Sequence, residues 1–149
     1  MVDVVKPSVD EVAGAVQAAV RLLVQRLRQT KAGEGDDLTS SETSALARLD
    51  RTGPTTPTDL ARLERISPQS MGATLAALEE RGLVARRADP TDGRRAILSL
   101  TQGGQELLVR RRSARSELLS QALASNFTRT ELKQLQVAAP LIERLAETI

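Results

Sequence analysis

Apolar residues recur at intervals of three and four near both ends of the chain. Between residues 9 and about 31 they form one helical stripe, made of Val12, Val16, Val20, Leu23 and Leu27. A second stripe follows Thr128 and consists of Leu132, Leu135, Val137, Leu141, Leu145 and Ile149. The pattern therefore predicts amphipathic helices at both ends. The alanines of the first helix would let another helix approach it closely.

Start signals divide the middle of the chain into shorter helices. Thr39 and Glu42 form a capping box, in which each side chain satisfies a backbone N–H that the helix leaves unpaired. Thr56-Pro57 and Ser67-Pro68 each place a capping hydroxyl before a proline that suits the first helical position. We expect the inward side chains of these helices to be Ala45, Leu46, Leu49, Leu60, Ala61, Leu63, Met71, Leu75 and Leu78.

A basic hairpin is predicted directly after the helix that begins at Pro68. Gly82 stands where a left-handed helix end is expected, and residues 83–88 and 96–100 are typical of short strands. Asp92-Gly93 between them favours a hairpin, because glycine accepts the positive φ that a tight turn demands. A charged hairpin alone is often only a solvated loop. Its position after two closely spaced helices predicts the wing of a winged helix-turn-helix.

Two further helices complete the predicted fold. Thr101 caps a long helix that reaches about residue 125, and Thr128 with Glu131 caps the last one, which Pro140 should kink. The end helices carry more apolar surface than one small winged helix can cover, so we expect them to form a dimer interface. The fold class is mainly α with a small β-hairpin wing. Residues 1–37 are expected to form a dimerisation helix and linker, 38–101 the winged helix-turn-helix, and 102–149 the C-terminal dimerisation helices.

Composition excludes several classes of function. The 149 residues include no cysteine and no histidine, which removes thiol redox switches, the common zinc sites and Ser-His-Asp catalysis. Phe127 is the single aromatic residue, which argues against a platform that stacks unpaired bases. We expect no catalytic residue, metal or cofactor. No apolar run has the length of a membrane span and the start lacks a signal peptide's apolar stretch, so we expect a cytoplasmic protein.

Basic charge is concentrated around and after the hairpin. Residues 81–129 carry ten Lys or Arg against four Asp or Glu, whereas residues 1–80 carry nine against twelve. This distribution is typical of a surface for an anionic partner. We interpret the arginines at 110, 111, 112 and 115 as a charged helix face.

Several segments together resemble the multiple antibiotic resistance regulator (MarR) family of bacterial winged-helix transcription regulators. They are residues 60–61, 67–70, 78–84, 86, 89–90, 92–94 and 100–101, followed by Gly104. The resemblance implies a homodimer that binds double-stranded DNA. It also implies that Asp92 and Arg94 form an ion pair in the wing, with the arginine entering the minor groove. A further implication is a small ligand, often anionic or aromatic, that lodges between the dimer helices and the winged lobe and weakens DNA binding.

Nine residues are the candidate DNA contacts. The helix starting at Pro68 offers hydroxyl, amide and methyl groups to the major groove, and the wing offers arginines to the minor groove and phosphates. The set is Ser67, Gln69, Ser70, Ala73, Thr74, Arg86, Asp92, Arg94 and Arg95. The alternative for Gln69 and Ser70 is capping of the helix, and for the arginines other than Arg94 it is a solubilising charge.

Gly72 and Ala73 depart from the resembled family, which often has polar or basic side chains there. Fewer long donors then face the groove, and we hypothesise that the wing and DNA shape carry an unusually large share of recognition.

We therefore expect a sequence-specific DNA-binding transcription regulator, acting as a ligand-responsive repressor on a palindromic operator with half-sites ~10 bp apart. The alternative is a winged helix used only for protein–protein contact, which steep salt dependence of DNA binding would exclude. An enzyme is disfavoured, because the chain lacks histidine, cysteine and a phosphate-cradling glycine motif.

Overall fold

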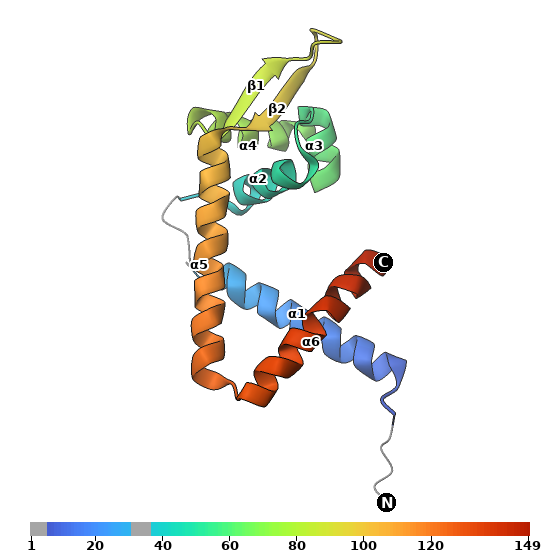
Figure 1. The fold of residues 1–149 in the computed structure, drawn as a ribbon. Coiled ribbons are helices and arrows are strands. Elements are labelled where there is room, and N and C mark those ends of the chain that lie inside the picture. Colours follow the sequence, from blue (N-terminus) through green and yellow to red (C-terminus); the bar gives the residue numbers. More distant parts are fainter. Residues whose placement is uncertain (1–5, 31–36) are drawn as a thin grey trace, which may run out of the picture.

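The computed structural model describes residues 6–30 and 37–149. At one end lies a winged lobe, built from three helices and a hairpin. The helices α1 (Val9–Gln29) and α6 (Arg129–Thr148) lie at the other end, and α5 (Gln102–Asn126) runs between the two (Figure 1). No helix in the described ranges is long and apolar enough to cross a bilayer. The elements are α1 (Val9–Gln29), α2 (Ser40–Thr52), α3 (Pro57–Glu64), α4 (Pro68–Glu80), β1 (Val84–Ala88), β2 (Ala96–Leu100), α5 (Gln102–Asn126) and α6 (Arg129–Thr148).

The predicted helix starts are confirmed. In α2 to α6 the hydroxyl of the N-cap residue accepts a hydrogen bond from the backbone N–H three residues on; these N-caps are Thr39, Thr56, Ser67, Thr101 and Thr128. A further capping box, between Ser8 and Glu11, begins α1. The first helix ends at Gln29, close to the predicted end near residue 31. Of the linker predicted over residues 32–37, all but Asp37 lie outside the described ranges.

The hydrophobic core lies within the winged lobe and the start of α5. Its buried members are Ala45, Leu46, Leu49, Leu60, Ala61, Met71, Leu75, Leu78, Leu83, Val84, Leu98, Leu107 and Leu108. The prediction for Leu63 is wrong: this side chain is 43% exposed, because it lies on the outer side of the short helix α3. Neither α1 nor α6 has a buried residue, so their apolar stripes stay uncovered in one chain.

The hairpin forms as predicted, with one addition. β1 pairs antiparallel with β2, with Val84 opposite Leu100 and Ala88 opposite Ala96. Thr55, just before α3, forms an isolated bridge to Leu98: each backbone N–H donates to the other residue's carbonyl, at 3.0 and 2.7 Å. This bridge, which the sequence pattern did not indicate, ties the base of the wing to the start of α3.

The connection between the strands occupies residues 89–95, the segment that the predicted strands leave between them, but its glycine differs from the expectation. Gly82 has the predicted positive φ of 71°, but Gly93 is not among the described positive-φ glycines. Two backbone hydrogen bonds close this loop. The N–H of Asp89 donates to the carbonyl of Arg95 at 2.9 Å, and the N–H of Arg95 donates to the carbonyl of Asp92 at 3.0 Å.

Arginines join α5 to the winged lobe. Arg111 is only 6% exposed, and its guanidinium donates to the hydroxyl of Thr43 on α2 at 3.1 Å. The next residue of α5, Arg112, forms an ion pair with Asp50 of α2. The interpretation of these arginines as a charged helix face is therefore wrong for Arg111, because α5 crosses α2 there and a buried charge requires polar partners. Arg112 is exposed and agrees with that interpretation.

Gly104 marks a close approach between α5 and the base of the hairpin. A Cβ atom at this position would lie 2.3 Å from the backbone carbonyl oxygen of Leu83. A Cβ at the neighbouring Gly103 would meet nothing closer than 3.5 Å. An alanine at position 104 would therefore clash with the hairpin, whereas an alanine at position 103 would change only the helix propensity.

Gly104→Ala should destabilise the fold by at least ~1–3 kcal/mol, because α5 and the Leu83 backbone must move apart. Gly103→Ala is the matched control and should be neutral or stabilising by up to about 1 kcal/mol, since alanine favours the helix. Thermal unfolding followed by circular dichroism measures both variants. Equal melting temperatures for the two variants would contradict the close packing at Gly104.

Candidate nucleic-acid interface

The start of α4 is an exposed, polar helix end. The Ser67 hydroxyl accepts from the Ser70 N–H at 3.1 Å and donates to the Ser70 hydroxyl oxygen at 2.9 Å. Pro68 has no N–H, so Gln69 carries the exposed first-turn amide, for which no acceptor is found among the described residues. The Ser70 hydroxyl keeps its own proton available for donation. Ser67 thus orders this helix end, while Gln69 and Ser70 retain donors for an outside acceptor.

The two faces of α4 differ sharply in chemistry. Met71, Leu75 and Leu78 are buried in the lobe, whereas the opposite face exposes Gln69, Ser70, Gly72 and Ala73. Thr74 is half-buried at the edge between the faces. A Cβ on Gly72 would meet nothing within 4 Å, so the fold does not require glycine there. The outward face is therefore open and offers few long side chains.

Aspartates order the loop at the tip of the wing. The Asp89 carboxylate accepts from the backbone N–H and the hydroxyl of Thr91 at 2.9 and 2.8 Å, and these bonds lower its pKa below the ordinary value. The Asp92 carboxylate accepts from the backbone N–H of Arg94 at 3.1 Å. The loop thus has a fixed shape before any partner arrives.

The Asp92–Arg94 pair differs from the ion pair that the family resemblance implies. Asp92 bonds to the backbone of Arg94, and no ion pair of the Arg94 guanidinium is found within the described residues. Arg94 is exposed at the tip, as is Arg95. The loop is therefore held by backbone bonds that leave the cationic side chain of Arg94 accessible.

Arg86 has a different environment from the arginines at the tip. Its guanidinium pairs with Glu79 of α4 at 2.9 Å. Directly opposite residues in an antiparallel pair share a face, so Arg86, opposite the buried Leu98, lies on the side of the hairpin that faces the lobe. Arg87 lies on the other side. Arg86 thus braces the wing against the end of α4.

Two features of this region escaped the sequence analysis. Glu79 was not singled out, although it stands near the end of the α4 sequence and therefore close to the start of the wing. Arg65, the C-cap of α3, adopts a left-handed conformation with φ 55° in the turn before α4. A non-glycine residue in that conformation gives no signal in the sequence, because arginine is common in ordinary turns and helices.

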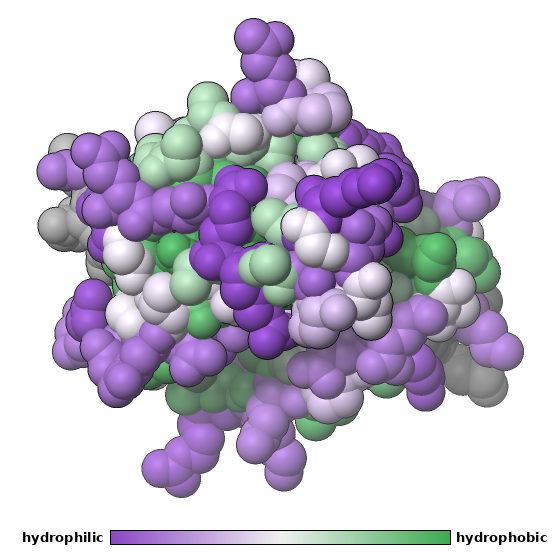
Figure 2. Space-filling view, turned by 90° about the horizontal axis from the view of Figure 1, so that it is seen from above, coloured by the Kyte–Doolittle hydropathy of each residue, from purple (hydrophilic) through white to green (hydrophobic). Residues whose placement is uncertain are grey.

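The helix α4 and the wing lie at the end of the molecule opposite α1 and α6 (Figure 1). Seen from this side, hydrophilic residues cover much of the surface, with intermediate and hydrophobic residues between them (Figure 2). Two helices joined by a short turn, an exposed second helix and an arginine-tipped hairpin define a winged helix-turn-helix protein.

Known proteins place the chain within one family of this class. The model of the MarR family matches residues 38–96. A helix-turn-helix-type transcriptional regulator of Mycobacterium bovis is 39% identical over 107 residues, which are 72% of this chain and 74% of that protein. The chain belongs to the MarR family of DNA-binding transcriptional regulators. The family resemblance of the sequence is thereby confirmed.

Solved structures share the fold over nearly the whole chain. A candidate transcriptional regulator of Pseudomonas aeruginosa superposes with a TM-score of 0.78 at 33% identity, covering 94% of this chain and 98% of that one. A variant of S. aureus MepR bound to an oligodeoxyribonucleotide has a TM-score of 0.67 at 24% identity, covering 90% and 98%. The predicted fold class is confirmed, and relatives that regulate transcription agree with the expected absence of enzymatic activity.

Separate aspartates should control separate amides of the wing loop. Asp92→Ala should raise the hydrogen-exchange rate of the Arg94 amide about fivefold, the equivalent of a hydrogen bond of about 1 kcal/mol, with little change at Thr91. Asp89→Ala is the matched control: it should raise the exchange rate of the Thr91 amide and leave that of the Arg94 amide nearly unchanged. Amide exchange measured by NMR tests this, and identical exchange profiles in the two variants would contradict the assignment of each carboxylate.

Proposed function

We propose that this protein is a sequence-specific repressor that binds a palindromic operator as a homodimer and releases it when a small ligand binds. The observation that carries the proposal is the exposed Arg94, which forms no ion pair with any described residue, at the tip of a wing that Asp89 and Asp92 hold in shape. It stands at the same end of the molecule as the outward face of α4. An ordered, cationic tip costs less to place in a groove than a flexible one does.

The chemistry of the two elements suits two grooves. On α4, Gln69 can pair with an adenine edge, Ser70 can donate to a base or a phosphate, and Ala73 can contact a thymine methyl. On the wing, Arg94 suits a narrow A·T-rich minor groove, and Arg95 suits a phosphate. Ser67 orders the helix end, Thr74 lies at its margin, and Arg86 braces the wing. The open surface over Gly72 supports the hypothesis that the wing carries an unusually large share of recognition.

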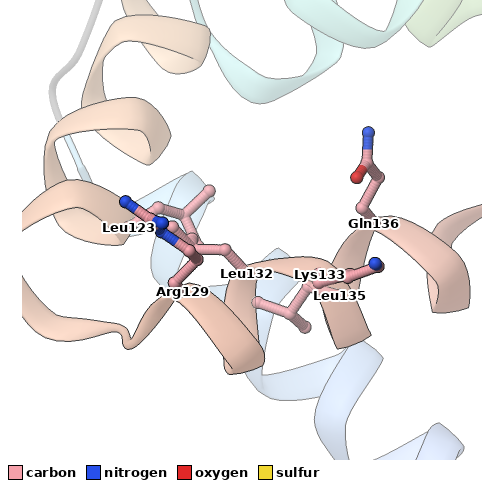
Figure 3. Close-up of a pocket in the computed structure, with 6 residues that line it drawn as sticks. All are labelled: Leu123, Arg129, Leu132, Lys133, Leu135 and Gln136. Atoms are coloured by element: carbon pink, nitrogen blue, oxygen red, sulfur yellow. The ribbon is translucent and has the colours of Figure 1, made fainter.

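A second copy of the chain is the proposed partner of α1, α6 and the far half of α5. The exposed apolar residues of these helices include Val20, Leu22, Leu23, Leu119, Leu132, Leu135, Leu141, Ile142 and Leu145. A cavity of about 740 Å³ in the angle between α5 and α6 continues this surface (Figure 3), lined by Leu123, Arg129, Leu132, Lys133, Leu135 and Gln136. Residues 1–37 and 102–149 would thus form the dimerisation region and 38–101 the DNA-binding domain.

The ligand response and the location rest on the family. Its members are expected to lose DNA affinity when a small anionic or aromatic molecule binds between the dimer helices and the winged lobe. We propose the same response here and a cytoplasmic location, where operator DNA is found. Selection of bound fragments from genomic DNA, followed by release assays with small aromatic carboxylates, tests the repressor and its inducer together.

Arg94→Ala should weaken binding of the selected operator by at least ~1–3 kcal/mol, because a cation in the minor groove is lost while the Asp92 bond to the backbone remains. Fluorescence anisotropy with a labelled duplex, at several salt concentrations, measures the effect. Arg87→Ala, on the opposite face of β1 from the lobe, is the charge-matched control and should change affinity less. Unchanged operator affinity in a folded Arg94→Ala protein would refute the minor-groove assignment.

The same salt series tests the alternative function. If DNA binding by the wild-type protein did not depend on salt, a protein–protein interaction module would be favoured.

Ile142→Glu should convert the dimer to a monomer. Ile142 shares one face of α6 with Leu135 and Leu145, so the new charge would be buried unpaired between the subunits. Thr148→Glu adds the same charge to α6 at an exposed position about 120° around the helix from Ile142, and should leave the dimer intact. Sedimentation velocity distinguishes the species; a wild-type monomer at micromolar concentration would contradict the proposed homodimer.

A further inference from the structure

The turn between α3 and α4 contains a residue in an unfavourable conformation. Arg65 has φ 55° and ψ 40°, the left-handed region, and its N–H donates to the carbonyl of Arg62 at 3.2 Å to end α3. Glycine, and less often asparagine, is favoured there, because a side chain on Cβ crowds the backbone in this region. Among the described residues only Asp37 is another non-glycine with positive φ. The turn therefore has a conformational reason to use glycine, and it uses arginine.

The Arg65 side chain has no polar partner in the part of the chain that the structure describes. Arg65 is exposed, and within the described residues its guanidinium forms no hydrogen bond or ion pair. Its neighbours differ: Arg62 pairs with Asp59 at 3.1 Å, and Glu64 pairs with Arg48 at 2.8 Å. Burial opposes ionisation of Glu64, but the bonds from Ser44 and Arg48 outweigh it and lower its pKa, so Glu64 is fully engaged elsewhere. Arg65 is thus an accessible cation that local salt bridges do not neutralise.

The position of Arg65 indicates which partner its charge serves. It precedes Ser67, the N-cap of α4, by two residues, and α4 is the helix proposed to enter the major groove. A long side chain at the entrance of that helix starts near the edge of the groove, where the phosphates lie. Base edges deeper in the groove are left to Gln69, Ser70 and Ala73.

We propose that Arg65 binds the DNA phosphate backbone beside the major groove, and that this contact is the reason arginine replaces glycine in a left-handed turn. The inference rests on the proposed DNA-binding function and deepens it. A phosphate contact carries no sequence information. Arg65 therefore contributes the same affinity on every DNA sequence and helps to position the protein on the duplex. Its guanidinium suits this role because it remains charged and can donate two parallel hydrogen bonds to one phosphate.

The test compares Arg65→Gly and Arg65→Lys with the wild type on the selected operator and on an unrelated duplex. Arg65→Gly should raise the melting temperature by several degrees, because glycine adopts the left-handed conformation without strain. The same variant should bind both duplexes about fivefold more weakly per protomer near physiological salt. The slope of log affinity against log salt should become shallower by about 0.9 per protomer. Arg65→Lys should keep the wild-type melting temperature and slope. Arg62→Ala, which removes an arginine already paired with Asp59, is the matched control and should bind nearly as the wild type does.

Each outcome has a defined meaning. A more stable Arg65→Gly protein with wild-type affinity and slope would overturn the phosphate contact, while wild-type binding of the operator would keep the proposed function. Equal losses in Arg62→Ala and Arg65→Gly would show a general charge effect and also overturn the assignment. If Arg65→Gly fails to fold, Arg65→Asn, which tolerates the same backbone conformation, provides the same comparison. Absence of salt-dependent duplex binding by the wild type would refute the proposed function itself.

Discussion

The arrangement of the molecule depends on a small junction at Gly82 and Leu83. The N–H of Leu83 donates to the carbonyl of Leu78 at 3.0 Å, which closes α4, and the carbonyl of Leu83 accepts from the N–H of Thr101 at 3.1 Å. The Thr101 hydroxyl donates to the carbonyl of Gly82 at 2.6 Å and accepts from the N–H of Gly104 at 3.1 Å, which opens α5. The end of the exposed helix, both ends of the hairpin and the start of the long helix thus meet within a few backbone groups. Gly82 in its left-handed conformation and Gly104 without a Cβ are what allow them to come so close.

Local signals in the sequence predicted most of this fold because they act within a few residues. Hydroxyl caps, prolines in the first helical turn and the glycine after α4 each determine a boundary through a bond or a dihedral angle that neighbouring residues supply. Predictions that required knowledge of a distant partner were weaker. The buried position of Arg111 depends on where α5 crosses α2, and the bridge of Thr55 to Leu98 joins segments more than forty residues apart. The outward position of Leu63 likewise depends on which side of a short helix meets the core.

The candidate site shows the same division. The exposed residues of α4 follow from helical periodicity, and their polar character was visible in the sequence. The pairing of charges was not visible in the sequence. An arginine on a strand meets a carboxylate of another element only once the register of the strands is set. Arg86 is held by Glu79, whereas Arg94 remains accessible since Asp92 binds a backbone amide. Acidic residues in this lobe therefore determine which of the arginines remain accessible, by engaging some guanidinium groups and by ordering the backbone beside others.

The length of α5 beyond the lobe has a mechanical consequence. Its last buried residue is Arg111, and the helix continues to Asn126. These final turns extend ~22 Å past the lobe at 1.5 Å per residue. A tilt of ~10° at the far end of such a rod would displace the lobe by ~4 Å, more than the 3.4 Å step between stacked base pairs. In the proposed homodimer, the spacing of the two lobes would thus be set by an angle at a distant contact between helices, and a small change of that angle would be magnified into a shift of position along the duplex.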